Sequence, residues 1–205
     1  MQRVTESFVT ALSKSNQDLL AEFSRGGALI LDNAEQLYRE ACILRDHGAL
    51  SRALCLHQLS KEECGKLELL GGYAVSIASG DPVNLKLMAK TLRDHRAKNN
   101  ANAYFAGVTE HERAARERKD WTTASRAFDK LKATLHDIFN TNKNAALYVG
   151  FEKRKFVAPK DVITEELVED IAALNQYFLS LTGGVAHALD RANPMADALA
   201  EFRRL

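Results

Sequence analysis

Glutamate, lysine and histidine side chains, which can transfer protons and bind phosphate, recur beside the apolar faces of the predicted helices. In the segment LHQLSKEECGKLELL (56–70), Glu63 falls within a leucine stripe, Lys66 lies at its edge and Glu62 lies further round the helix. A carboxylate on a buried face is costly unless it is paired or hydrogen-bonded. We therefore expect either incomplete burial of this stripe or a polar site around Glu63.

Polar side chains intrude in the same way into the two neighbouring helices. Asn33 lies on the apolar face of the preceding helix, with Glu40 at its edge, and His95 lies beside the apolar stripe of the following helix. If the three helices face each other, Asn33 and His95 converge with Glu63 and Lys66. Two interpretations remain open: a satisfied polar network that fixes helix register, and a site whose coupled groups have perturbed pKa values.

The sequence lacks the motifs of several common catalytic sites. It has no Glu-x-x-His and no His-x-x-x-His, so a di-metal carboxylate bundle is not predicted. It also lacks G-x-S-x-G, G-x-G-x-x-G and G-x-x-x-x-G-K. Cys42, Cys55 and Cys64 form no C-x-x-C and are expected to be small core residues. We expect neither a metal nor a cofactor.

Composition predicts one helical domain over residues 1–205. The chain is 46% hydrophobic and 27% charged, with three prolines and eleven glycines, as in a soluble protein with long helices. A net charge of +1 gives no overall bias toward nucleic acid, so an RNA-binding surface would be a local patch. No run reaches the ~18 apolar residues of a membrane span, and the N-terminal residues lack signal-peptide features. We expect a cytoplasmic protein with no membrane partner.

Helical periodicity covers nearly the whole chain and predicts an all-α fold. We expect breaks at Gly26-Gly27, Gly80-Asp81-Pro82 and Gly183-Gly184, a bend or early end at Gly71-Gly72, and Pro194 at the last helical piece. The expected helices cover residues ~3–23, ~28–47, 51–79, 82 to 95 or as far as 118, and 122–140, with a further helix capped by Thr164. The aromatic and β-branched segment AALYVGFEKRKFVAP (145–159) predicts a short hairpin.

Four segments of the chain resemble, in the same order, the AbiV family of bacterial abortive-infection proteins, a branch of the HEPN superfamily. They are NAEQLYREACIL (33–44), ALCLHQLSKEECGKLELL (53–70), RDHRAK (93–98) and ALYVGFEKRKFVAPKDVITEE (146–166). The resemblance covers about residues 28–180, flanked by N- and C-terminal helices. It implies a HEPN-like bundle with a four-helix core plus extra helices. It also implies a phage-defence protein that halts the infected cell by attacking RNA or translation.

The hallmark of active HEPN RNases is an arginine followed, after four to six residues, by a histidine on a late helix. Only Arg52 and His57 satisfy that spacing, but they lie on an early helix, ~140° apart, and are read as a chance match. At the late position the chain has KNAALY, in which Lys143, Asn144 and Tyr148 replace arginine, asparagine and histidine. Lysine lacks the bidentate fork of arginine, and a tyrosine with a pKa near ~10 is a poor base at neutral pH.

RNA cleavage of the kind that the resemblance implies is attack of a ribose 2′-hydroxyl on the adjacent phosphate, with no metal. His95 is the predicted base or acid, with lysines supplying charge and Glu63 orienting them. The candidate catalytic residues are His95, Glu63, Lys66, Lys143 and Tyr148. RNA contacts are predicted for Lys98, Arg93, Arg96 and Asn144, and a structural polar network for Asn33, Glu40 and Glu62.

Two classes of function therefore remain open. One is an endoribonuclease effector with a divergent site, and the other is a non-catalytic protein that binds a phage product or the translation machinery. A phage protein as trigger, or an antitoxin, is the expected partner in addition to RNA. The resemblance also implies a homodimer, and the apolar surface of the first helix, the segment LYV (147–149) and ADALAEFRRL (196–205) favours one.

Overall fold

The computed structural model describes residues 14–190, which are almost entirely helical. The α-helices are α2 (Lys14–Asp46), α3 (Leu50–Ala78), α4 (Leu85–Thr91), α5 (His95–Ala101), α6 (Glu110–Glu117), α7 (Trp121–Leu147), α8 (Pro159–Val162) and α9 (Glu165–Asp190). One turn of 3₁₀-helix, η1 (Asn102–Tyr104), follows α5. Two short strands, β1 (Gly150–Glu152) and β2 (Lys155–Val157), pair antiparallel. The predicted all-α class with a small hairpin is confirmed.

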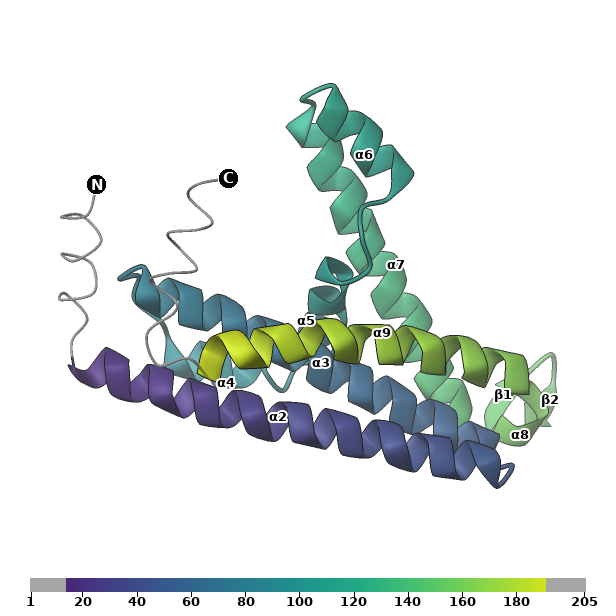
Figure 1. The fold of residues 1–205 in the computed structure, drawn as a ribbon. Helices are drawn as coiled ribbons and strands as arrows, with labels where there is room; N and C mark the ends of the chain where they lie inside the picture. The colour runs from purple at the N-terminus through teal and green to yellow at the C-terminus, as the bar shows by residue number, and fades with distance from the viewer. Residues whose placement is uncertain (1–13, 191–205) are drawn as a thin grey trace.

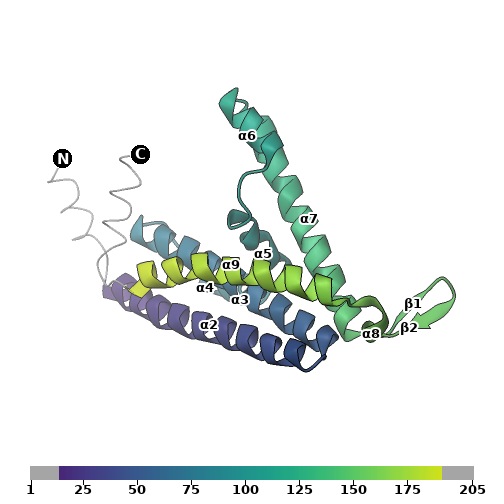
Figure 2. The same ribbon diagram turned by 45° about the vertical axis from the view of Figure 1, so that its right-hand side comes forward.

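Three long helices, α2, α3 and α9, run side by side and form the body of the molecule (Figure 1). Helix α7 meets α3 at one end of this body and projects away from it, with α6 packed along its outer half (Figure 2). Helix α5 and η1 contact both α3 and α7. Helix α3 is therefore enclosed by α2, α9, α5 and α7.

Apolar clusters at three levels hold the long helices together. Leu54 of α3 and Val168 of α9 are fully buried in one cluster. A second cluster contains Leu67 of α3 and Leu189 of α9, and Phe178 lies at the centre of a third. Burial of each such side chain stabilises the fold by roughly 1.5–3 kcal/mol, which is enough to specify how α3 and α9 pack.

The predicted breaks at Gly26-Gly27 and Gly183-Gly184 are wrong, because α2 and α9 each pass through their glycine pair without interruption, and α3 does not end at Gly71-Gly72. A Cβ on Gly27 would lie 3.0 Å from Leu189 Cδ1 and 3.3 Å from Leu67 Cδ1, and one on Gly71 would lie 3.1 Å from Val185 Cγ1. These glycines let helices approach closely. The packing gained there outweighs the ~1 kcal/mol that glycine costs inside a helix.

The predicted single helix from residue 82 onward is also wrong, because the chain forms separate short helices there. Each begins at a polar cap: the side chains of Asn84, Asp94 and Thr109 accept hydrogen bonds from the backbone N–H three residues later. Such caps satisfy donors that would otherwise be orphaned at a helix start. The cap at Asp94 makes His95 the first residue of α5.

The C-terminal half follows the prediction more closely. Helix α7 continues to Leu147 rather than ending at Asn140, because Phe139 and Ala146 on its inner face remain buried. The hairpin lies inside the predicted segment 145–159. Thr164 caps α9, with Oγ1 accepting from Leu167 N at 3.2 Å. The predictions for Pro194, for residues 196–205 and for a helix start near residue 3 lie outside the described residues.

Candidate functional site

Glu62 of α3 is a buried carboxylate that contacts three basic side chains from two other helices. Its Oε1 accepts a hydrogen bond from Lys143 Nζ of α7 at 2.6 Å. Its Oε2 lies 2.9 Å from Lys98 Nζ and 2.5 Å from His95 Nδ1, both of α5. We call these four residues the Glu62 cluster. It joins α3, α5 and α7 at the point where the projecting arm meets the body.

A glycine and a helix cap position the cluster. A Cβ on Gly65, less than one turn after Glu62, would overlap the carbonyl oxygen of Lys98 and lie 2.9 Å from the carbonyl carbon. Only glycine therefore allows α5 to lie this close to α3. Asn102 fixes the far end of α5 by donating from Nδ2 to the carbonyl of Lys61 at 2.9 Å. With α5 beginning at His95, His95 and Lys98 fall three residues apart on one face.

The charges in the cluster do not balance. Burial by itself raises the pKa of Glu62, but hydrogen bonds from Lys143 and Lys98 outweigh burial and hold that pKa below its ordinary value. The carboxylate is therefore ionised at neutral pH and faces two ammonium groups. The formal charges of Glu62, Lys98 and Lys143 therefore sum to +1, which favours an anionic ligand such as phosphate.

His95 is the exposed member of the cluster. Its side chain is 58% exposed, whereas those of Lys98 and Lys143 are 8% and 10% exposed. When Nδ1 carries the proton and donates to Glu62, Nε2 is left as a proton acceptor on the accessible ring. Lys143 Nζ lies 3.5 Å from the same Nδ1. The arrangement is that of a solvent-accessible base with an ionised carboxylate behind it and ammonium groups beside it.

The family model HEPN_AbiV, described as AbiV, matches residues 22–180, which include the whole Glu62 cluster. The chain belongs to the AbiV family of HEPN proteins. No solved structure matches this chain.

A curated relative of this AbiV protein is the uncharacterized protein y4gJ of Sinorhizobium fredii (strain NBRC 101917 / NGR234). The two are 31% identical over 103 residues, which is 50% of this chain and 54% of the relative. The chain thus spans about half the length of the curated relative that it matches. The family assignment accordingly rests on the family model.

The predicted convergence of Asn33, Glu63 and Lys66 with His95 is not what the AbiV structure contains. Glu63 and Lys66 pair with each other along α3, with Lys66 Nζ 2.5 and 2.7 Å from the two carboxylate oxygens. Asn33 and Glu40 are exposed on α2. The partner of His95 is Glu62, one residue before Glu63 and therefore ~100° round the helix.

The KNAALY segment contributes one residue to the cluster. Lys143 is buried against Glu62, whereas Asn144 is exposed and Tyr148, just past the end of α7, is 66% exposed. The Tyr148 hydroxyl makes no hydrogen bond with any described residue. Arg93 and Arg96 are exposed around the start of α5, so both remain accessible to an RNA backbone.

The Arg52 and His57 match does not form a site. Arg52 is exposed, whereas His57 is fully buried, with its ring against Tyr38 and Nδ1 3.3 Å from Asn175 Nδ2. Burial, with nearby Lys61, lowers the pKa of His57 to about 4. His57 is thus a neutral core residue at physiological pH.

Sequence reasoning missed Lys61, which immediately precedes Glu62. Its side chain is fully buried, and Nζ lies 3.6 Å from the centre of the Phe139 ring without a hydrogen-bond partner among residues 14–190. Burial lowers the pKa of Lys61 to about 7. The signal in the sequence was the run Lys61-Glu62-Glu63, three consecutive charges in a helix otherwise rich in leucine and alanine.

The described part of the chain offers no metal site and no membrane span. Residues 14–190 contain no group of three or more His, Cys, Asp or Glu side chains placed to hold a metal ion. None of the helices between Lys14 and Asp190 combines the length and apolarity that a bilayer crossing requires.

Proposed function

We propose that this AbiV protein is an abortive-infection effector that cleaves RNA in infected cells without a metal, using the Glu62 cluster. The observation that carries the proposal is the exposed His95 ring held at Nδ1 by the buried, ionised Glu62. That pairing orients a base on a side chain that is 58% exposed. The two ammonium groups beside it supply the positive charge that a phosphate substrate requires.

In the proposed reaction, His95 Nε2 takes the proton of a ribose 2′-hydroxyl, and the 2′-oxygen forms a bond to the adjacent phosphorus. Glu62 stabilises the imidazolium that results, as a carboxylate behind a catalytic histidine does in other hydrolytic sites. Lys98 and Lys143 offset the negative charge that develops on the phosphorane oxygens. The bond from phosphorus to the 5′-oxygen then breaks, and that oxygen takes a proton from the Lys143 ammonium. The products are a 2′,3′-cyclic phosphate and a 5′-hydroxyl.

The experiment compares cleavage of total cellular RNA by the wild-type protein and by His95→Ala, each with and without EDTA. The matched control is His111→Ala, which removes another exposed histidine, on α6 and outside the cluster. We expect EDTA-resistant fragments ending in 2′,3′-cyclic phosphate from the wild type and from the control. His95→Ala is expected to lose cleavage, since general acid–base catalysis contributes about 10²–10⁴-fold.

A second candidate function is a non-catalytic one, in which the protein binds a phage product or the translation machinery. The observation that favours it is the burial of both cluster lysines, which also serve to fix α5 and α7 on α3. It predicts that RNA stays intact at large protein excess while His95→Ala still protects cells from phage. That pair of results would replace the RNase proposal.

A further inference from the structure

The β1–β2 hairpin extends beyond the end of the helical body (Figures 1 and 2). Two aromatic rings of the hairpin are exposed to solvent. Phe151 and Phe156 lie opposite each other in the register and are 63% and 80% exposed. Their ring centres are 5.0 Å apart and the rings are inclined at 57°. Because the rings pack mainly on each other, most of the surface of each remains available to a flat ligand.

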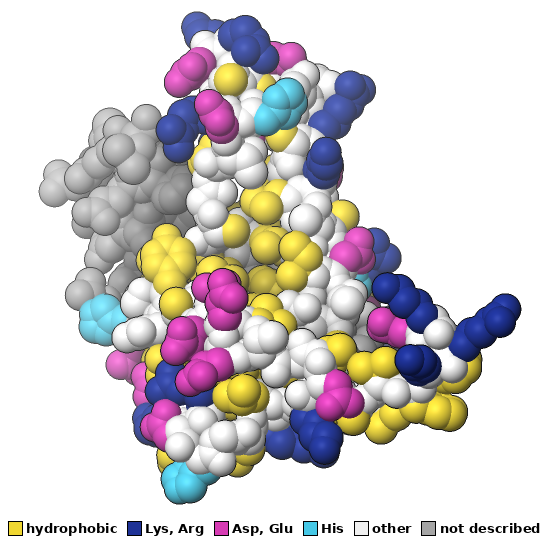
Figure 3. Space-filling view, turned by 90° about the vertical axis from the view of Figure 1, so that its right-hand side faces the viewer, with side chains coloured by type: hydrophobic (Ala, Val, Ile, Leu, Met, Phe, Trp, Pro, Cys, Tyr) yellow, Lys and Arg dark blue, Asp and Glu magenta, His cyan; other side chains and the backbone are white. Residues whose placement is uncertain are grey.

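The turn of the hairpin is positively charged. Lys153, Arg154 and Lys155 face a single carboxylate, that of Glu152, and none of the four forms an ion pair with the described residues. Figure 3 shows Lys and Arg side chains beside exposed hydrophobic side chains at the lower right, on the part of the surface that bears the hairpin. The hairpin therefore places an unneutralised positive charge immediately next to an aromatic surface.

The backbone of the turn indicates that this charge is not there for local stability. Lys153 and Arg154 have φ values of 46° and 65°, in the left-handed region that favours Asn and Gly. An Asn-Gly pair would form the same turn with less strain. The chain instead carries two long cations at these two positions, and strained backbone positions cluster at ligand-binding and active sites.

We propose that this hairpin binds an unpaired stretch of RNA, whose bases stack on Phe151 and Phe156 while its phosphates contact Lys153, Arg154 and Lys155. Proteins that bind single strands without sequence preference combine aromatic rings, on which the bases stack, with cationic side chains that contact the phosphate backbone. In a duplex the base faces are stacked on one another, so they are not available to stack on these rings. The inference rests on the proposed function for its ligand, because it names the part of the chain that captures the RNA.

The position of the hairpin fits that role. Lys143 of the Glu62 cluster and Gly150 at the start of β1 are seven residues apart, joined by the last turn of α7 and Tyr148-Val149. A strand held on the hairpin is thus tethered close in the chain to a cluster cation.

The charged residues occupy the tip, with the aromatic pair behind them. Insertion into a bilayer would drive the charged tip through first, which disfavours a membrane ligand.

The test measures fluorescence anisotropy of a labelled RNA single strand of about 12 nucleotides, a length within the range that one binding module covers. The protein is the full chain carrying His95→Ala, so the probe is not cut. We expect Phe151→Ala with Phe156→Ala to weaken binding about thirtyfold or more. A blunt duplex of the same sequence is expected to bind more weakly than the single strand and to be insensitive to the two substitutions.

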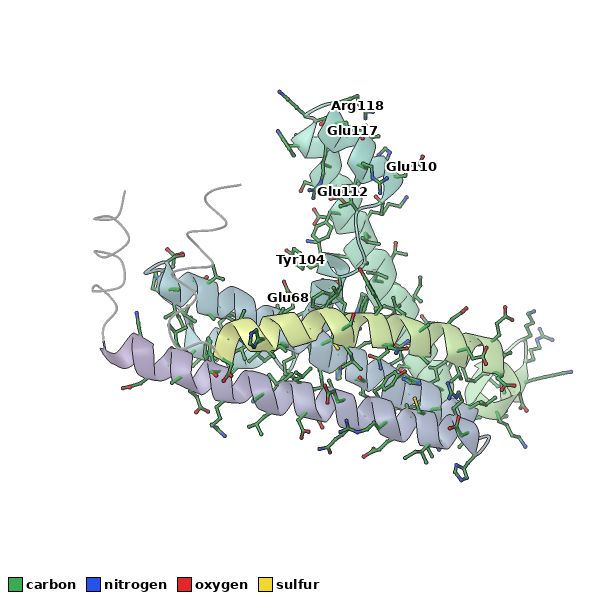
Figure 4. All side chains as sticks on the ribbon, in the orientation of Figure 1. Glu68, Tyr104, Glu110, Glu112, Glu117 and Arg118 are labelled. Carbon is green, nitrogen blue, oxygen red and sulfur yellow. The ribbon has the colours of Figure 1, made fainter. Side chains whose placement is uncertain are left out.

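A second variant separates binding from folding. Lys153→Asn with Arg154→Gly installs the preferred turn residues, so the thermal melting temperature should stay the same or rise. Binding of the single strand should nevertheless weaken, and the slope of log K against log salt concentration should become shallower by about 1.4, or about 0.7 for each of two lost phosphate contacts. The matched control is Arg118→Ala with Lys119→Gly, which removes two charges at the α6–α7 turn, where Lys119 also has a positive φ of 58°. Figure 4 shows Arg118 at the outer end of the arm, well away from the hairpin.

The outcomes are decisive in both directions. Equal loss in the hairpin and control variants, or no binding of the single strand, overturns the inference. Binding to phosphatidylglycerol vesicles that needs the two phenylalanines, with RNA binding that does not, also overturns it and makes the hairpin a membrane contact. If the hairpin variants lose RNA binding but the wild-type protein never cleaves RNA, the inference stands and the RNase proposal fails.

Discussion

Glu62 Oε2 and His95 Nδ1 lie 2.5 Å apart, although the two residues are 33 positions apart in the chain and belong to different helices. The contact depends on two local features: Asp94 starts α5 at His95, and Gly65 lets α5 lie directly on α3. A carboxylate in this position holds the imidazole in one tautomer and one orientation. The contact therefore couples the packing of three helices to the chemistry of one exposed ring.

Glu62→Gln should destabilise the protein strongly. The change keeps the shape of the side chain but leaves the ammonium groups of Lys98 and Lys143 buried without a counter-charge. Removing one partner from a buried ion pair typically costs about 3–5 kcal/mol. Glu63→Gln, one position along, breaks a more exposed pair with Lys66 and should cost about 1 kcal/mol or less. Urea unfolding of both variants measures the difference, and equal losses would contradict the central role of Glu62.

The same carboxylate predicts acid sensitivity. Because the pKa of Glu62 is lower in the folded state than its unfolded value near 4.5, its stabilising effect is present above that pH and is lost as the pH falls below it. Urea unfolding between about pH 6 and pH 3 should show wild-type stability declining more steeply than that of Glu62→Gln. Parallel declines would show that other carboxylates dominate the acid response.

Gly65→Ala should disrupt the cluster, although alanine normally favours a helix. The added Cβ would overlap the Lys98 carbonyl, so α5 must move away from α3 and carry His95 and Lys98 with it. Overpacking of this kind costs about 1–3 kcal/mol. Gly72→Ala is the matched control in the same helix, because nothing lies within 4 Å of its Cβ position. The free energy of unfolding of that variant should rise by about 0.5–1 kcal/mol. Chemical denaturation of the two variants shows whether Gly65→Ala destabilises the protein while Gly72→Ala stabilises it.

Lys61→Met should stabilise the protein at neutral pH. The folded pKa of Lys61 is about 7, compared with 10.5 for an unperturbed lysine, so the unfolded state binds more protons between those values. Wild-type stability should therefore rise as the pH rises from 7, and the variant should lose this slope. We expect the free energy of unfolding to rise by more than about 1 kcal/mol at pH 7. The methionine side chain has a similar length and is neutral, so it does not have to lose a proton when it is buried.

The informative pH window for Lys61 ends near 9. Burial raises the pKa of the Cys64 thiol from 9.0 to about 11, so that group acts in the opposite sense at higher pH. Guanidinium unfolding of wild type and Lys61→Met between pH 7 and pH 9 isolates the lysine. Identical slopes in this window would mean that Lys61 keeps its proton in the core, held by the Phe139 ring.

The sequence predicted the all-α class and the hairpin but placed Glu63, rather than Glu62, beside His95, and the reason lies in α3. Periodicity identifies the buried face of a helix that has one solvent face. Helix α3 has one interface with α2 and α9 and a second with α5 and α7, and a single leucine stripe does not mark both. Glu62 looked peripheral to that stripe but faces the second interface.

The residues that lie next to capping signals were easier to predict than those that depend on packing. Thr164 began α9 as expected, because a cap acts within three residues. Gly27 and Gly65 were unpredictable, because their role is defined by Leu189 and Lys98, which are distant in the chain. His95 and Lys143 were identified as chemically important, but their shared partner could only be found in three dimensions.

We propose that the working form is a homodimer, as the superfamily resemblance implies. The outer side of α2 carries the largely exposed Leu29 and Ile43, about four helical turns apart and therefore on one side of the helix. Leu29→Glu with Ile43→Glu should convert a particle of twice 22.8 kDa to one of 22.8 kDa in light scattering, without loss of helical circular dichroism. Leu87→Glu, on the exposed face of α4, is the matched control and should leave the mass unchanged. A wild-type protein that is monomeric at micromolar concentration and still protects cells from phage would contradict the dimer.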